Sequence, residues 1–219
     1  MTLEHVIFDL DGTLIDSAPG IAWSIDEALH SCGLAAADCD VARLIGPPVR
    51  EILASVSGSA ETAVLDQLES GFRRAYDSEG WRRTVCQPGV AEMLWQLLTA
   101  GSQMWLLTNK PSLATARILS ALKLSGFFQA TICRDSGDRH FRSKAEMLSD
   151  LLERAHMKRE RCLLVGDTAE DWLAARESGI SCVIVSHGYG GADLPRDAQR
   201  IHEWRELHSV LAKGLEIKA

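Results

Sequence analysis

The chain has 219 residues, enough for one large or two small domains and for a core that needs no disulfide or structural metal to fold. Hydrophobic residues make up 46% and charged residues 24%, which is typical of a globular protein and excludes a disordered one. A net charge of −7 argues against broad binding to nucleic acid polymers or anionic membranes. The six cysteines form no C-x-x-C pair, which argues against a structural zinc site.

No apolar run approaches the ~18–20 residues that a membrane span needs. The first residues, Met1 to His5, lack the basic start and long apolar stretch of a signal peptide. We therefore expect a cytoplasmic protein without a membrane partner.

In chain order, the first expected element is a short buried strand at residues 6–8, which ends at Asp9. Residues 18–32, 48–55 and 61–76 then show helical patterns with no convincing strand among them. We expect residues 16–82 to form an all-helical insertion, and residues 1–15 and 83–219 to form the domain that it interrupts.

From residue 89 onward, helical patterns alternate with continuous apolar runs. The expected helices cover residues 90–100, 112–124, 144–155, 170–178 and 203–213, and the expected strands cover residues 104–107, 131–133, 162–165 and 182–185. Continuous apolar runs suit strands that are buried on both faces of a parallel sheet. The alternation predicts an α/β fold with a doubly wound, Rossmann-like parallel sheet.

Three of these strands end in residues that carry chemistry. The segments are Asp9-Leu10-Asp11-Gly12-Thr13, Thr108-Asn109-Lys110 and Gly166-Asp167-Thr168-Ala169-Glu170-Asp171. Ligands of open parallel sheets bind at the carboxyl ends of the strands, so we expect one crevice to collect Asp9, Asp11 and Asp167. Grouped carboxylates repel one another unless a cation lies among them, and Mg²⁺ prefers such oxygen ligands together with a substrate phosphate.

An ionised aspartate in such a site is also a nucleophile that needs no base to activate it. Asp11 is placed to donate a proton to a leaving alkoxide and later to activate water. Gly12 permits a close backbone approach, Thr13 offers a hydroxyl near the turn, and both are candidates for binding the phosphate.

These segments resemble the motifs of the haloacid dehalogenase-like phosphohydrolases. The first segment is similar to the family's D-x-D-G-T motif, and Leu106-Leu107-Thr108-Asn109 is similar to the second motif. Lys144 matches the third-motif lysine, and the segment from Gly166 to Asp171 matches G-D-x-x-x-D. The helical insertion is similar to the family's cap, so the resemblance covers essentially the whole chain.

The resemblance implies a role for each matched position. Asp9 would be the nucleophile and a Mg²⁺ ligand, and Asp11 the general acid and base with its backbone carbonyl on the metal. Thr108 and the backbone N–H of Asn109 would bind the phosphoryl group, and Lys144 would neutralise it. Asp167 would hold the metal, and Asp171 would bind it through water or orient its ligands.

Three residues have a second interpretation. Thr168-x-x-Asp171 is also a helix N-terminal capping pattern. Lys110 is a rival for the role of Lys144, because the lysine in much of the subgroup is followed by proline and here by Ala145. Arg50, in the segment Gly46-Pro47-Pro48-Val49-Arg50, is a candidate for binding a second anionic group of the substrate or an ordinary exposed helix residue.

The presence of Asp11 favours phosphate-ester hydrolysis or phosphoryl transfer, because dehalogenases of the family lack this residue. The Thr108-Asn109-Lys110-Pro111 segment and the cap most resemble phosphoglycolate phosphatase-like members; nucleotidase-like and β-phosphoglucomutase-like members are alternatives. The expected partner is a small phosphorylated metabolite, and the chain is expected to be a monomer or a homodimer. A receiver-like phosphorylatable switch is the alternative from a different class, but such domains have no helical insertion.

Overall fold

The structure, a computed structural model, describes residues 3–45, 48–137, 140–190 and 194–213. It divides into two compact units, Met1–Ile15 with Cys86–Ala219 and Asp16–Val85. The chain passes between them through β2 (Ile15–Asp16) and β3 (Val85–Cys86), which pair with each other. The helical insertion ends at Val85, three residues beyond the expected residue 82. The reason is that the short helix η2 (Gly80–Arg83) packs against the start of the insertion. A Cβ on Gly20 would lie 2.1 Å from the carbonyl oxygen of Gly80.

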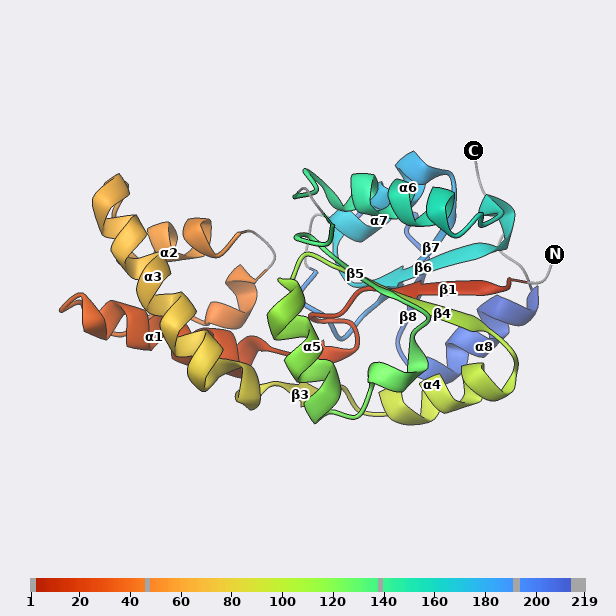
Figure 1. The fold of residues 1–219 in the computed structure, drawn as a ribbon, viewed down its shortest axis with the longest axis horizontal. Coiled ribbons are helices and arrows are strands. Elements are labelled where there is room, and N and C mark those ends of the chain that lie inside the picture. Colours follow the sequence, from red (N-terminus) through yellow and green to blue (C-terminus); the bar gives the residue numbers. More distant parts are fainter. Residues whose placement is uncertain (1–2, 46–47, 138–139, 191–193, 214–219) are drawn as a thin grey trace. The chain divides into compact units, whose positions relative to one another are not determined.

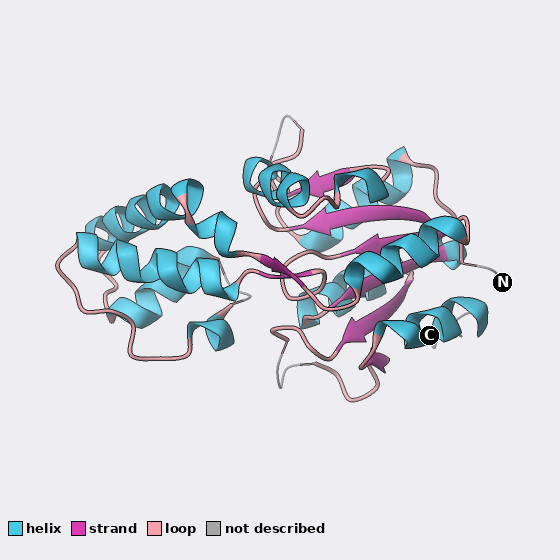
Figure 2. Ribbon diagram, turned by 90° about the horizontal axis from the view of Figure 1, so that it is seen from below, coloured by secondary structure: helices cyan, strands magenta, loops and turns pink. Residues whose placement is uncertain are grey.

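The larger unit is built on a six-stranded sheet with the order β5-β4-β1-β6-β7-β8 (Figures 1 and 2). All of its strand pairs are parallel. The strands are β1 (His5–Phe8), β4 (Gln103–Thr108), β5 (Thr131–Cys133), β6 (Cys162–Gly166), β7 (Ser181–Val185) and β8 (Arg200–Ile201). The first five confirm the strands expected from the apolar runs. Strand β8 was missed because two residues are too short to form a pattern.

Helices cover both faces of this sheet, as in a doubly wound fold. In Figure 1, α6 and α7 lie on one face and α4, α5 and α8 on the other. The helices are α4 (Val90–Thr99), α5 (Ser112–Ala121), α6 (Lys144–Arg154), α7 (Ala169–Ser178) and α8 (Trp204–Lys213), with short 3₁₀ helices η3 (Ser125–Phe127) and η4 (Arg159–Arg161). The predicted Rossmann-like α/β fold is confirmed, and the helix ends differ from expectation by at most three residues.

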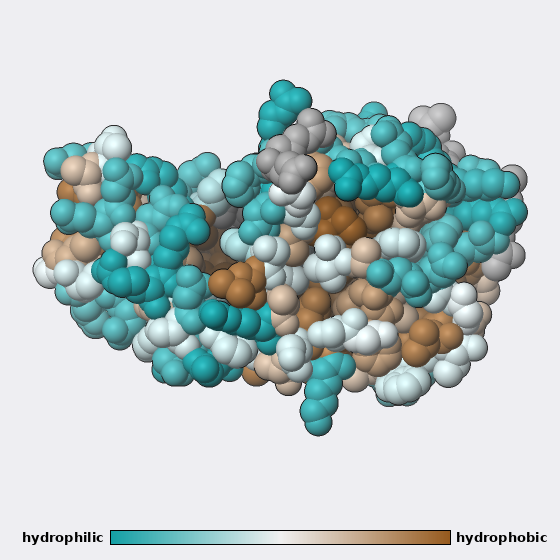
Figure 3. Space-filling model, in the orientation of Figure 1, coloured by the Kyte–Doolittle hydropathy of each residue, from teal (hydrophilic) through white to brown (hydrophobic). Residues whose placement is uncertain are grey.

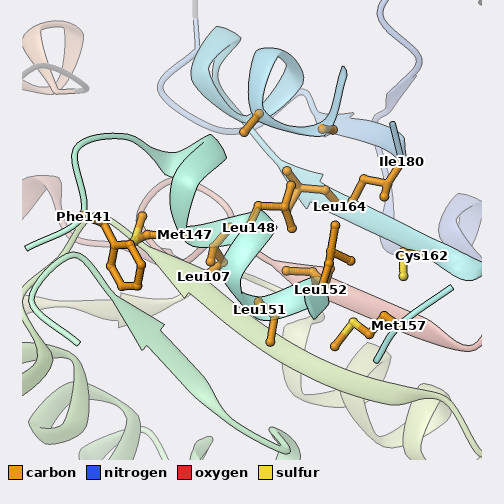
Figure 4. Packing of buried hydrophobic residues seen from close by; sticks show 13 residues of the cluster. Leu107, Phe141, Met147, Leu148, Leu151, Leu152, Met157, Cys162, Leu164 and Ile180 are labelled. Atoms are coloured by element: carbon orange, nitrogen blue, oxygen red, sulfur yellow. The ribbon is translucent and has the colours of Figure 1, made fainter. Parts of the chain in front are cut away.

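Helix α6 is fixed to the sheet by a buried apolar cluster (Figure 4). Leu148 and Leu152 of the helix join Leu107 of β4 and Leu164 of β6 in this cluster. Burying one leucine side chain contributes roughly 1.5–3 kcal/mol. This packing fixes the position of the first residue of α6, which is Lys144.

The smaller unit consists of helices around a core of its own. Its elements are α1 (Ala18–Ser31), η1 (Val41–Leu44), α2 (Val49–Ser57), α3 (Thr62–Ser78) and η2. Its core side chains are Ile25, Ala28, Leu29, Val41, Ile52, Leu53, Leu65 and Leu68. A Cβ on Gly71 would lie 3.2 Å from the Cα of Ala28, so α1 and α3 approach closely there. Within the described part of residues 17–84 no strand is present.

The described residues contain no membrane helix and no disulfide. None of their helices is both long and apolar enough to cross a membrane. All six cysteines lie in the described ranges, and all are free thiols. On the face drawn in Figure 3, hydrophilic residues predominate and hydrophobic ones form separate patches.

Candidate active site

Strands β1 and β6 are neighbours at the point where the chain's crossovers change direction. From β1 the chain continues to β4 and β5 on one side of the sheet, and then returns to β6, β7 and β8 on the other. Ligands of open α/β sheets bind outside the carboxyl ends of the strands at such a switch point. Asp9 follows β1 and Asp167 follows β6, and the backbone N–H of Asp9 donates to the carbonyl of Val165 at 2.9 Å. The topology therefore brings both aspartates to one edge.

Three buried carboxylates lie together at this edge. An oxygen of each of Asp9, Asp167 and Asp171 lies within 4.8 Å of the others. The side chain of Asp11 pairs with Lys110, and the third carboxylate of this cluster is Asp171, which the resemblance places at or near the metal. Gly166 makes room for it, since a Cβ there would lie 2.2 Å from Cγ of Asp171.

Lys144 forms ion pairs with two carboxylates of this cluster. Its Nζ lies 2.6 Å from Oδ1 of Asp9 and 2.6 Å from Oδ1 of Asp171. The side chain is 4% exposed. Ser143 caps α6 by accepting a hydrogen bond from the N–H of Glu146 at 3.1 Å, so the helix begins at the lysine.

Burial and charge perturb all four groups. Burial raises the pKa of Asp9 well above its usual value, although the charge of Lys144 acts in the opposite direction. Burial also raises the pKa of Asp167 to about 6, and the negative charge of Asp171 raises it further. Burial alone would raise the pKa of Asp171, but Lys144 outweighs it and the pKa is lowered. Burial alone would lower the pKa of Lys144, but the charges of Asp171 and Asp9 outweigh it and the pKa is raised.

One ammonium thus faces three buried carboxylates. Buried charges are stable only when they are paired or bind a metal, and one lysine does not neutralise three carboxylates. An additional cation would therefore stabilise this site. Carboxylate oxygens are the ligands that a hard divalent cation such as Mg²⁺ prefers. The donor set of Asp9, Asp167 and Asp171 therefore fits a magnesium ion.

Asp167 gives the metal-free protein a pH-dependent stability. Its pKa is about 6 in the folded chain against 3.8 for the free group, so the folded state binds more protons and loses stability as pH rises through 6. This difference corresponds to about 3 kcal/mol at neutral pH. We expect the free energy of unfolding of wild type, relative to Asp167→Asn, to fall by up to this amount between pH 4 and 7.

Denaturant unfolding of both proteins in a chelator measures this difference. The asparagine is a matched change, because its oxygen can still accept from the N–H of Tyr189 and its amide can donate to Thr13. Saturating Mg²⁺ should remove the loss in wild type, since the metal then replaces the proton. A difference between the two proteins that stays constant from pH 4 to 7 in the chelator would contradict the assignment.

Asp171 forms the predicted helix cap and also contacts Lys144. It forms a capping box with Thr168, whose N–H and hydroxyl donate to Oδ2 of Asp171 at 3.0 and 2.7 Å. Its other oxygen, Oδ1, pairs with Lys144. Capping therefore holds this carboxylate in the cluster rather than excluding it.

The two candidate lysines contact different aspartates. Lys144 contacts Asp9, whereas Nζ of Lys110 donates to Oδ1 of Asp11 at 2.7 Å. Thr108 is buried at the end of β4, and its hydroxyl accepts from the N–H of Lys110 at 3.1 Å. The geometry thus favours Lys144 as the cation beside Asp9, whereas Lys110 forms an ion pair with Asp11.

Thr13 contacts two of the carboxylates, and Gly12 leaves space for one of them. The Thr13 hydroxyl donates to Oδ1 of Asp167 at 3.0 Å and lies 3.4 Å from Oδ2 of Asp9. Gly12 has φ +83°, and a Cβ on it would lie 2.3 Å from Oδ2 of Asp167. The Thr13 hydroxyl therefore lies against Asp9 and Asp167, and Gly12 is required for the close approach; that these two residues bind phosphate stays a prediction.

Sequence analysis missed the segment that follows β7. The N–H of Tyr189 donates to Oδ2 of Asp167 at 2.7 Å. A Cβ on Gly190 would lie 1.7 Å from the carbonyl oxygen of Asp167, so only glycine fits there. Nε2 of His187, in the same segment, lies 3.0 Å from the carbonyl oxygen of Thr13. The signal was two glycines around an aromatic residue directly after a predicted strand.

Arg50 belongs to the helical unit and is paired within it. Its Nη1 lies 2.7 Å from Oδ1 of Asp66 and 3.0 Å from Oε2 of Glu69, both on α3. This geometry supports the interpretation of Arg50 as a helix-surface residue. Gly46 and Pro47, the start of the expected substrate loop, lie outside the described residues.

A comparison with protein families shows which family the chain belongs to. The family model described as haloacid dehalogenase-like hydrolase matches residues 6–185, most of the chain. The chain is a haloacid dehalogenase-like hydrolase. The resemblance inferred from the motifs is therefore confirmed.

Relatives of this hydrolase carry different names. It is 36% identical to the tyrosine-protein kinase PtkA of Mycobacterium tuberculosis over 87% of this chain, and it spans 65% of that protein's length. It is 36% identical to a phosphoglycolate phosphatase of Pseudomonas savastanoi over 84% of this chain and 70% of the relative. It is 30% identical to a 5'-nucleotidase of Pseudomonas aeruginosa over 94% of this chain and 93% of the relative.

Solved structures agree with the fold of this hydrolase. The structure of PtkA from M. tuberculosis superposes with a TM-score of 0.82 at 31% identity, over 96% of this chain and 98% of that one. A predicted phosphoglycolate phosphatase from Haemophilus somnus superposes with a TM-score of 0.85 at 22% identity, over 96% and 98% of the two chains.

Proposed function

We propose that this protein is a Mg²⁺-dependent phosphatase that hydrolyses a small phosphate monoester through an aspartyl-phosphate on Asp9. The observation that carries the proposal is the pairing of Asp9, buried at the end of β1, with Nζ of Lys144 at 2.6 Å beside two further carboxylates. Asp11 lies two residues away and is bonded to Lys110. The names of the phosphatase and nucleotidase relatives support the same reaction class.

The two aspartates divide the chemistry between them. A carboxylate oxygen of Asp9 forms a bond to phosphorus while the ester P–O bond breaks, and Asp11 gives its proton to the leaving oxygen. Asp11 then takes a proton from water, whose oxygen attacks phosphorus. The bond between phosphorus and Asp9 breaks, which releases inorganic phosphate and restores both carboxyl groups.

The neighbouring residues bind the phosphoryl group and hold the nucleophile. Lys144 offsets negative charge on the phosphoryl oxygens and on Asp9 in a site that excludes water. The Thr108 hydroxyl and the backbone N–H of Asn109 follow the next strand and are assigned to the phosphoryl oxygens. Asp9, Asp167 and Asp171 would hold Mg²⁺, with the backbone carbonyl of Asp11 as a further ligand. When bound, the ion would mask the negative charge of the phosphate from the attacking carboxylate.

The residues assigned to the phosphoryl group and the metal all belong to the larger unit, so we assign choice of the ester to the helical unit, Asp16–Val85, as a cap domain. Glycolate-like and nucleoside esters are the first candidates, because relatives of both kinds match this chain. Free thiols suit a reducing compartment, which supports action in the cytoplasm on a small metabolite.

A second candidate is transfer of the phosphoryl group to a tyrosine hydroxyl, which the similarity to PtkA favours. The same Asp9 would accept the phosphoryl group from a nucleoside triphosphate, and a tyrosine oxygen would replace water in the second step. Incubation with ATP and a tyrosine peptide distinguishes the two, since only transfer yields phosphotyrosine.

The test of the proposed function is release of inorganic phosphate from a panel of small phosphate monoesters. We expect many turnovers per protein molecule with at least one ester, loss of activity in a chelator and recovery on addition of Mg²⁺. Equal rates with and without metal, or no release from any ester in the panel, would contradict the proposal.

A further inference from the structure

We propose that Arg134, in the turn after β5, is a positioning residue that holds the phosphoryl-binding segment after β4 in register with the segment that carries Lys144. This inference rests on the proposed function, because it assigns those segments to the phosphoryl group. Sequence analysis singled out neither Arg134 nor the residues around it.

The guanidinium of Arg134 joins two segments that are far apart in the chain. Its Nη1 donates to Oδ1 of Asn109 at 3.2 Å, and its Nη2 donates to the carbonyl oxygen of Arg142 at 2.8 Å. The first acceptor lies directly after Thr108, and the second lies two residues before Lys144. A planar guanidinium with donors in a fixed fork sets both distances at once.

The other end of the Asn109 amide is also bonded. Its Nδ2 donates to Oε2 of Glu170 at 2.7 Å, and Glu170 precedes Asp171 on α7. With both ends of the amide occupied, the side chain fixes the backbone of residue 109 and leaves the backbone N–H as the group for a phosphoryl oxygen. Arg134, Asn109 and Glu170 therefore connect the ends of β4, β5 and β6.

The residue after Arg134 holds the far end of the same segment. Asp135 accepts from the N–H and the hydroxyl of Ser112, the first residue of α5, at 2.8 and 3.0 Å. Lys110, which contacts Asp11, lies between the two held positions. The turn after β5 thus fixes residues 109–112 at both ends.

The segment that carries Lys144 lacks a proline that would restrict its backbone, so a contact from outside the segment matters more there. Proline would fix φ after the lysine, but Ala145 stands there. The Arg134 contact to the carbonyl of Arg142 supplies a constraint on the other side of Lys144, from outside the apolar core. Arg134 reaches the site through Asn109 and the carbonyl of Arg142, so its proposed effect is on their position.

The experiment compares Arg134→Ala and Arg134→Lys with Arg142→Ala in the full chain. Arg142→Ala is the matched control, because the acceptor is its backbone carbonyl and its side chain is 90% exposed. We measure kcat and KM for an ester that wild type hydrolyses, the affinity for inorganic phosphate by calorimetry with Mg²⁺, and the unfolding temperature.

We expect Arg134→Ala to lower kcat/KM on the order of 10²-fold, as small misplacements of bound groups do, and to weaken phosphate binding. Arg134→Lys should be intermediate, and millimolar guanidinium should restore part of the activity of Arg134→Ala but not of wild type. Arg142→Ala should resemble wild type. Phosphate affinity and kcat/KM within twofold of wild type in Arg134→Ala, or losses without guanidinium rescue that follow the unfolding temperature, would overturn the inference.

Failure of the proposed function has a different signature. If wild type and Arg142→Ala release no phosphate from any ester, the proposed reaction is wrong. The calorimetric comparison still decides the role of Arg134, because phosphate binding needs no turnover.

Discussion

Asp9→Asn is expected to abolish turnover, with a loss on the order of 10⁴-fold or more, as when a nucleophile is removed from other enzymes. Asparagine has nearly the shape of aspartate and can still accept from Lys144 and Thr13, but its neutral amide cannot form the acyl phosphate. Because the substitution also removes a buried carboxylate next to two others, the folded variant should be at least as stable as wild type without metal. Phosphate release and denaturant unfolding together measure both effects.

Asp11→Asn is the matched comparison, since it is the same chemical change two residues away. It keeps the nucleophile and loses the proton donor, so the rate should fall by ~10²–10⁴. With a nitrophenyl ester the leaving group needs little protonation, so Asp9 should still be phosphorylated while attack by water is slow. Phosphoenzyme should accumulate in Asp11→Asn and be absent from Asp9→Asn. Turnover by Asp9→Asn at the wild-type rate would show that the roles are wrongly assigned.

Replacement of Lys144 is the second change with a large expected effect. Lys144→Met keeps the length of the side chain but leaves Asp9 and Asp171 without their cation. Breaking a buried ion pair on one side costs about 3–5 kcal/mol. We expect a loss of that order in the free energy of unfolding without metal, and a fall in kcat/KM of ~10²–10³ because a charge that stabilises the transferring phosphoryl group is lost.

Two features separate this prediction from a general loss of stability. Mg²⁺ should restore more stability to Lys144→Met than to wild type, since it neutralises the same carboxylates, whereas activity should stay low. Lys158→Met is the control, because Lys158 is exposed and the hydrogen bonds from Cys162 and from the N–H of Arg161 go to its backbone carbonyl oxygen. Near-normal kcat/KM in Lys144→Met would give the role to another cation, of which Lys110 is the first to test.

The sequence was sufficient to predict the sheet and most of the site, for a local reason. Continuous apolar runs identify strands buried on both faces, and a polar residue directly after such a run must lie at the carboxyl edge. Asp9, Thr108 and Asp167 were found in this way. The start of α6 at Lys144 followed from a helical pattern and a serine before it.

The rest depends on side chains that meet only in the folded chain. The G-D-x-x-x-D spacing pointed to Asp171, but its pairing with Lys144 and the close approach that Gly166 allows are visible only in the folded chain. The contacts of Arg134 with Asn109 and with the carbonyl of Arg142 join the ends of β5 and β4 to the segment before α6, and no sequence motif marks them. The boundary at Val85 depends on packing between Gly20 and Gly80, which are distant in sequence.

The position of the phosphoryl group on the trapped enzyme tests the central claim most directly. Asp11→Asn, incubated with Mg²⁺ and a nitrophenyl ester, is quenched in acid, digested and analysed by mass spectrometry. The account predicts a hydroxylamine-labile phosphoryl group on Asp9 in the peptide that contains residues 6–13. A phosphoryl group on any other residue, or turnover of the ester with none on Asp9 at any time, would contradict it.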